Sequence, residues 1–75
     1  HAILEDHVMI HPGVRVSGHV HIGARVLIGT NSAIYQGKKI GADVMIDAMT
    51  YINRDIESNM ICSSARQLKV FKRVF

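Results

Sequence analysis

Aliphatic residues recur at every sixth position along most of this 75-residue chain. The series runs without interruption through nine repeats: Leu4, Ile10, Val16, Ile22, Ile28, Ile34, Ile40, Ile46 and Ile52. Helices and β-hairpins have no six-residue period, whereas hexapeptide repeats are typical of parallel β-helices. The period therefore predicts a chain that winds around a prism and turns one aliphatic side chain per face into the core.

Three six-residue repeats make one coil of about 18 residues, so nine repeats give roughly three coils. Coils stack at the parallel-strand spacing of about 4.8 Å. The core should then hold three aliphatic columns: Leu4, Ile22 and Ile40; Ile10, Ile28 and Ile46; Val16, Ile34 and Ile52. We expect an all-β fold, a parallel β-helix of about three coils. The alternative is a chance run of strands in a β-sandwich.

The neighbouring positions predict the corners and the outer surface. Glycines follow three of the aliphatic residues, and we expect positions such as Gly29 to form tight corners with φ > 0. Val14, Val20 and Val26 stand two places before an aliphatic residue, and we expect them to point outward. Closed symmetric oligomers are the usual way to bury such apolar surface, so the sequence predicts a trimer.

The period stops near Asn53, which suggests two parts. We assign residues 1–57 to the hexapeptide-repeat β-helix and residues 58–75 to a C-terminal cap or tail, because repeat arrays need caps at their ends. The apolar residues available for this cap are Ile56, Met60, Ile61, Leu68, Val70, Phe71, Val74 and Phe75. We expect a further N-terminal part to cover the other end of the prism.

Charge and cysteine content exclude some functions. The net charge is only +3 and aromatic residues make up 5%, which argues against a nucleic-acid-binding protein. The positive charges of the tail, Arg66, Lys69, Lys72 and Arg73, either contact a phosphate or form a solvated face. Cys62 is the one cysteine and cannot form an internal disulfide, which favours a reducing cytoplasm. No apolar stretch reaches the length of a membrane span.

Five histidines raise the question of a metal ion or a general base. Zinc enzymes use three protein ligands and an open position, and no two histidines have the His-x-x-x-x-His spacing of trimeric β-helical carbonic anhydrases. We therefore expect no metal. The 18-residue coil stacks His1 with His19, and His7 with Arg25 and Asp43, on outer edges, where a histidine is most simply an exposed polar residue.

Motifs for covalent catalysis and for nucleotide binding are missing. The sequence has no nucleophilic serine elbow, phosphate-binding P-loop or dinucleotide-binding glycine motif. Direct transfer between two bound substrates, assisted by one histidine base, fits these residues better than covalent catalysis.

Three segments carry a resemblance to a known family. Residues 7–17 (HVMIHPGVRVS), 18–33 (GHVHIGARVLIGTNSA) and 39–56 (KIGADVMIDAMTYINRDI) are similar to N-V-H-I-A-P-G-A-V-L-S, G-x-V-x-I-G-x-x-x-x-I-G-x-x-x-x and K-I-G-x-x-x-x-I-G-A-G-A-V-V-x-K-D-I. They resemble the hexapeptide acyltransferases, especially the bacterial sialic acid O-acetyltransferase-like and UDP-amino-sugar N-acetyltransferase enzymes. The resemblance implies a left-handed β-helix, a homotrimer, acetyl-CoA in a groove between adjacent prisms, and an N-terminal α/β subdomain for the sugar nucleotide.

The resemblance also implies site residues for acetyl transfer to a hydroxyl or amine of a sugar or nucleotide sugar. The family's catalytic histidine aligns one residue before His1, and a one-residue shift makes His1 the base that deprotonates the acceptor. Backbone groups of Gly29, Thr30 and Ala48 would hold the pantetheine of acetyl-CoA, and Arg66 would approach its phosphates.

Several positions depart from the family pattern. Met9 occupies the position of a cofactor-contacting histidine and cannot hydrogen-bond as an imidazole does. Asp47 and Met49 replace two glycines where CoA would approach the backbone, and residues 62–66 (CSSAR) keep only the alanine and the base of G-x-P-A-K/R. The alternative function is therefore a trimerising β-helix scaffold that has lost catalysis.

Overall fold

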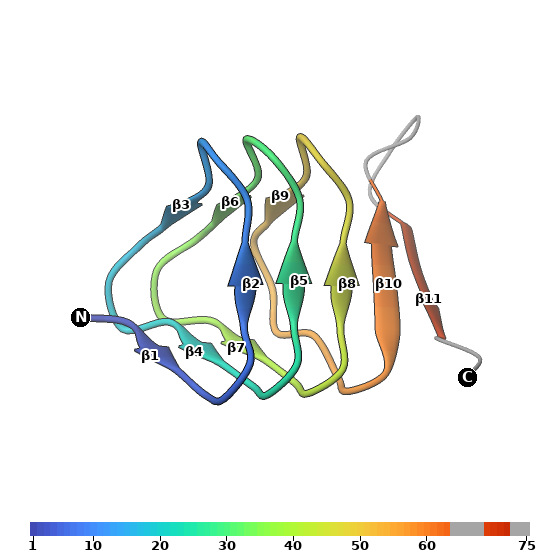
Figure 1. Cartoon of the computed structure of the whole chain (residues 1–75), viewed down its shortest axis with the longest axis horizontal. Coiled ribbons are helices and arrows are strands. Elements are labelled where there is room, and N and C mark those ends of the chain that lie inside the picture. Colours follow the sequence, from blue (N-terminus) through green and yellow to red (C-terminus); the bar gives the residue numbers. More distant parts are fainter. Residues whose placement is uncertain (64–68, 73–75) are drawn as a thin grey trace.

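The chain winds as short parallel strands around a three-sided prism (Figure 1). The computed structural model describes residues 1–63 and 69–72. The strands are β1 (Ile3–Leu4), β2 (Met9–Ile10), β3 (Arg15–Val16), β4 (His21–Ile22), β5 (Leu27–Ile28), β6 (Ala33–Ile34), β7 (Lys39–Ile40), β8 (Met45–Ile46), β9 (Tyr51–Ile52), β10 (Met60–Ser63) and β11 (Lys69–Lys72). Within the described residues, no helix is long and apolar enough to span a membrane.

Each strand from β1 to β6 pairs with the third strand after it in the chain, and this pairing gives the prism its three faces. We call them the β1 face (β1, β4 and β7), the β2 face (β2, β5, β8, β10 and β11) and the β3 face (β3, β6 and β9). From β1 to β9, parallel pairing joins residues 18 apart, so that Ile28 lies between Ile10 and Ile46 in the middle of the β2 face. This register confirms the three predicted columns and the parallel β-helix of about three coils.

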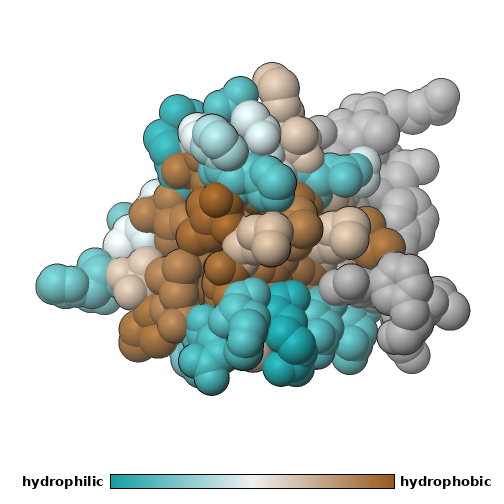
Figure 2. Space-filling model, in the orientation of Figure 1, coloured by the Kyte–Doolittle hydropathy of each residue, from teal (hydrophilic) through white to brown (hydrophobic). Residues whose placement is uncertain are grey.

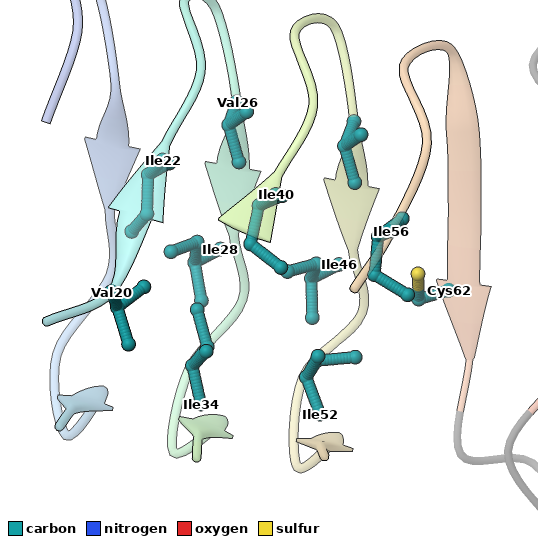
Figure 3. Close-up of a cluster of buried hydrophobic side chains, with 11 residues drawn as sticks. Val20, Ile22, Val26, Ile28, Ile34, Ile40, Ile46, Ile52, Ile56 and Cys62 are labelled. Atoms are coloured by element: carbon teal, nitrogen blue, oxygen red, sulfur yellow. The ribbon is translucent and has the colours of Figure 1, made fainter. Parts of the chain in front are cut away.

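The aliphatic residues of the second and third coils are buried in the interior (Figure 3). Residues two places earlier are also inside: Val20 and Val26 are each 1% exposed, and Val14 packs against the core. The expectation that these valines point outward is wrong. In an extended segment, side chains two residues apart lie on the same side, so both turn toward the core. The prediction of a trimer therefore has no support from outward-facing valines.

The corners differ from the expectation at the glycines. Gly29 does not have a positive φ. The left-handed conformation occurs instead three places after the inward aliphatic residues from Leu4 to Ile46, and again three places after Ile56. The residues with positive φ are His7, Gly13, His19, Arg25, Asn31, Gly37, Asp43, Met49 and Asn59. Gly29 serves another purpose, because a methyl group there would lie 2.5 Å from the amide nitrogen of Ala48 in the next coil.

The repeat shortens at its C-terminal end instead of stopping. Ile56 bridges to Ile40 and Cys62 pairs with Ile46, a separation of 16 residues in place of 18. Ile56 and Cys62 are both buried and extend two core columns. β10 runs parallel to β8, and β11 then pairs antiparallel with β10. The division after residue 57 and the capping role of the tail stay predictions.

Candidate functional site

Three of the predicted cofactor-binding residues lie together on one corner of the prism. We call the turns at residues 11–14, 29–32 and 47–50 the β2–β3 corner, because they join those two faces. Gly29 and Thr30 lie one coil below Ala48, and the amide of Met49 donates to the carbonyl oxygen of Thr30 at 2.8 Å. The structure thus brings Gly29, Thr30 and Ala48 into adjacent coils.

This corner presents free backbone donors. Among the described residues, the amide N–H groups of Thr30 and Ala48 have no hydrogen-bond partner, whereas the equivalent amide of Ala42 donates to Ser58 Oγ at 3.0 Å. Two such donors one coil apart can bind the carbonyl oxygens of an extended ligand. The amide of Ala24 on another corner is equally free. These free amides therefore allow a ligand to bind at the β2–β3 corner, but they do not distinguish this corner from the one that holds Ala24.

A buried serine holds the β2–β3 corner rigid. Ser32 is fully buried, and its hydroxyl donates to the carbonyl oxygen of Asp47 at 2.7 Å. The same hydroxyl accepts from the amide of Thr50 at 3.1 Å. These bonds tie the second coil to the third, because buried polar groups are stable only when they are paired. Asp47 itself is exposed, so a carboxylate stands at this corner.

Met9 lies on the β2 face, beside this corner. Its side chain is 59% exposed and stacks in register with outward-facing residues of β5, β8 and β10. We call Met9, Leu27, Met45 and Ile61 the apolar row. Figure 2 shows a central hydrophobic band in this view, bordered by hydrophilic residues. The outward residues of the β1 face, Ile3, His21 and Lys39, are more polar, so the three faces differ in chemistry.

His1 lies on a different corner from the predicted cofactor residues. It is exposed, and its carbonyl oxygen accepts a hydrogen bond from the amide of His19, between the β3 and β1 faces. The predicted stacking of His1 with His19 is thus observed. Within one prism, however, His1 and Ala48 occupy separate corners, so a single chain does not bring the predicted base and the predicted cofactor residues together.

The corner between the β1 and β2 faces carries an ion pair. Arg25 Nε and Nη2 donate to the two carboxylate oxygens of Asp43 at 2.7 and 2.9 Å. The hydrogen bond and the charge of Asp43 raise the pKa of Arg25 above its ordinary value. Both residues have positive φ, as does His7, which lies one coil below Arg25 and two coils below Asp43. The predicted stack is present, and the side chains of Arg25 and Asp43 join the second coil to the third.

A histidine–carboxylate contact was missed by the sequence reasoning. His21 Nε2 lies 2.6 Å from Glu5 Oε2, and the two side chains are 45% and 49% exposed. Glu5 stands one coil below Gly23, and its backbone amide donates to the carbonyl oxygen of Ile22 at 2.9 Å. The 18-residue register could have revealed the pair, because Ile3 and Leu4 pair with His21 and Ile22.

Three further features were considered for the candidate site: Arg66, a metal-binding cluster and a surface pocket. Arg66 lies outside the described residues. Among residues 1–63 and 69–72, no group of three or more histidine, cysteine, aspartate or glutamate side chains could hold a metal ion. An open pocket of about 390 Å³ is lined by Arg54, Asp55, Ile56, Glu57 and Met60, where the repeat shortens. None of the predicted site residues that the structure describes lines this pocket.

Comparison with known proteins confirms the resemblance. Residues 1–36 match the family model "Bacterial transferase hexapeptide (six repeats)". The acetyltransferase domain of PglB from Neisseria gonorrhoeae, solved with acetyl coenzyme A, is 31% identical with a TM-score of 0.85. The match covers 91% of this chain and 33% of that one, so this chain spans about a third of its length. No curated protein matches the chain.

Two structures from Caulobacter crescentus share the fold. A variant of perosamine N-acetyltransferase with CoA and GDP-perosamine is 23% identical, with a TM-score of 0.86 over 92% of this chain and 32% of that one. PerB with the same ligands is 15% identical, with a TM-score of 0.72 over 92% of this chain and 53% of that one. Residues 1–36 thus carry the hexapeptide repeat, and the chain shares the β-helical fold of these structures.

Proposed function

We propose that this chain is the β-helical part of an acetyltransferase that moves an acetyl group from acetyl-CoA to a hydroxyl or amine of a sugar or nucleotide sugar. The observation that carries the proposal is the similarity to the acetyltransferase domain of PglB at 31% identity over 91% of this chain. That domain was solved with acetyl coenzyme A, and perosamine N-acetyltransferase with CoA and a GDP-sugar.

The β2–β3 corner fits an extended amide-rich cofactor. The free N–H groups of Thr30 and Ala48 can donate to pantetheine carbonyls, and the exposed thioether of Met9 offers an apolar contact nearby. Gly29 contributes by allowing the two coils to stack closely, since any side chain there would collide with the backbone of Ala48. Bound acetyl-CoA supplies the thioester, and the chain supplies its orientation and a base.

We propose a homotrimer because the separation of His1 from the β2–β3 corner requires a second prism. In a groove between two prisms, the corner of one prism that carries His1 would lie next to the β2–β3 corner of the other. The apolar row gives this assembly its contact surface, since Met9, Leu27, Met45 and Ile61 carry no charge and lie in a line on one face. Such uncharged patches are typical of interface cores.

Sedimentation tests the assembly. We expect a trimer at micromolar concentration, which Met45→Glu on the apolar row should dissociate. Lys39→Glu changes the charge of an exposed residue on the β1 face and is the matched control. A stable wild-type monomer would contradict the trimer.

Calorimetry with acetyl-CoA on the full-length protein tests the cofactor site. Ala48→Glu places a carboxylate at the β2–β3 corner and should weaken binding at least about 10-fold, through repulsion of the CoA phosphates. Ala24→Glu makes the same change at the equivalent position of another corner and should leave the affinity within about 3-fold. Absence of binding by the wild-type protein would reject the enzyme and leave the trimerising scaffold.

A further inference from the structure

We infer that His21, held by Glu5, is the general base for the acceptor, an assignment that rests on the proposed acetyl transfer. His21 Nε2 and Glu5 Oε2 lie 2.6 Å apart on the β1 face. Within the described part of the chain, the rings of His1, His7, His11 and His19 make no hydrogen bond or ion pair. His21 is thus the histidine whose ring orientation is fixed by a carboxylate.

The contact also determines which nitrogen carries the proton. An ionised carboxylate can only accept hydrogen bonds, so Nε2 of His21 must be the protonated nitrogen. In the neutral ring the lone pair then resides on Nδ1, and among the described residues Nδ1 has no hydrogen-bond partner. A free, correctly oriented lone pair on a half-exposed ring can accept a proton from a bound substrate.

The position of His21 suits the proposed reaction. His21 follows the corner that holds His1 and His19, and its side chain projects from the β1 face between Ile3 in the coil below and Lys39 in the coil above. His21 pairs with Ile3, two residues after His1, so both histidines lie on the same side of the prism. The facing charged groups are Glu5 below and Lys39 above, so the pair lies in a polar region able to bind a sugar.

The proton and electron pairs balance in this step. The acceptor oxygen or nitrogen forms a bond to the thioester carbonyl carbon, and its proton passes to Nδ1 of His21. The C–S bond breaks with its electron pair on sulfur, and the proton then moves from His21 to the thiolate to give free CoA. Glu5 is a positioning residue, since it contacts the imidazole and not the acceptor.

Acetyl-transfer kinetics of the full-length protein with amino-sugar and hydroxyl-sugar acceptors test the assignment. His21→Gln should lower kcat at least about 100-fold, the contribution expected of a general base, with the acetyl-CoA Kd unchanged. Glu5→Gln should lower kcat by a smaller factor, and Glu5→Asp should restore part of the loss. His7→Asn removes an exposed histidine from the corner between the β1 and β2 faces, keeps a residue that tolerates positive φ, and is the control.

Three outcomes overturn the inference, and a fourth rejects the proposed function on which it rests. Undiminished kcat in His21→Gln, or a collapse confined to His1→Gln, would place the base elsewhere in an active enzyme. Nitrogen NMR of the free protein gives a readout without turnover, and a neutral His21 protonated on Nδ1 would refute the geometry. A wild-type protein that neither binds acetyl-CoA nor transfers acetyl groups would instead reject the proposed function, and the base assignment with it.

Discussion

Gly29 lies directly against the backbone of Ala48 in the next coil. A methyl group built on Gly29 would lie 2.5 Å from the amide nitrogen of Ala48 and 2.7 Å from the carbonyl carbon of Asp47. These neighbours are backbone atoms whose positions are held by strand pairing between β5 and β8. The corner therefore excludes a side chain at residue 29 for a reason of packing, independent of any ligand.

Gly29→Ala should consequently destabilise the prism. Overpacking costs about 1–3 kcal/mol in general, and the rigid backbone neighbours place this substitution at the upper end or beyond. Gly18→Ala is the matched control, because its added methyl group would meet nothing closer than 3.6 Å and Gly18 has no positive φ. Thermal unfolding of both variants measures the difference. Equal melting temperatures would contradict the close approach of the coils.

Ile28→Ala tests the central core column. Ile28 is fully buried between Ile10 and Ile46, so truncation leaves a cavity and should cost about 2–5 kcal/mol. Arg25→Ala removes an exposed ion pair with Asp43 and should have a much smaller effect that shrinks as salt is added. Denaturant unfolding at two salt concentrations distinguishes them. Similar losses at both positions would contradict the inward assignment of Ile28.

The sequence predicted the inner columns because one aliphatic residue per face is the minimum that a stacked prism needs. It failed at Val20 and Gly29 for geometric reasons: Val20 shares a side of its strand with Ile22, and Gly29 is selected by coil spacing. The continuation of the core through Ile56 and Cys62 was also missed, since a coil two residues shorter removes the six-residue period without removing the stacking.

The site was less predictable than the fold. Stacking Gly29, Thr30 and Ala48 on one corner follows from the repeat, but the contact between His21 and Glu5 depends on the conformations of their two side chains. Periodicity specifies which column a residue occupies, and it does not specify side-chain conformation. The relation between His1 and the cofactor corner depends on a second prism, which the pattern within one chain does not describe.

Ser32→Ala should loosen the β2–β3 corner. The substitution leaves the amide of Thr50 and one hydrogen-bond site on the Asp47 carbonyl without their partner, which costs about 1–3 kcal/mol for buried groups. Thr50→Val is the control, because it removes a longer bond, from Thr50 Oγ1 to the Ala48 carbonyl oxygen at 3.3 Å, and preserves the shape. Hydrogen exchange at the Thr50 amide should accelerate in Ser32→Ala alone.

Cys62 should be unreactive in the folded protein. Burial raises the pKa of its thiol, against a smaller opposite effect from Arg54, so the folded state disfavours the thiolate that reacts. The raised pKa contributes stability that is complete below the ordinary thiol pKa of about 8.5 and is lost as pH rises through the higher folded value. A thiol reagent should label Cys62 only on unfolding, and Cys62→Ala should lack this alkaline loss. Rapid labelling of the native protein would contradict its burial.

Asp47 should determine how strongly the β2–β3 corner binds acetyl-CoA. Its exposed carboxylate stands one coil above Gly29, beside the free amides of Thr30 and Ala48, and repels a polyanionic cofactor. Asp47→Gly should therefore tighten binding measured by calorimetry. Asp47→Asn separates two causes: equal gains identify the charge, whereas a gain in Asp47→Gly alone identifies the bulk of the side chain.

Arg66→Ala should have the opposite effect on the affinity for acetyl-CoA, because Arg66 is predicted to approach the phosphates of CoA. Binding should weaken, and the loss should diminish at high salt, because an exposed charge contact is screened within about 10 Å at 0.1 M ionic strength. Thermal stability should barely change in Arg66→Ala, so that a change in affinity reports on the site. If neither Asp47 nor Arg66 affects a measurable affinity, CoA does not lie along this corner. If the wild-type protein has no affinity, the β-helix acts as a scaffold.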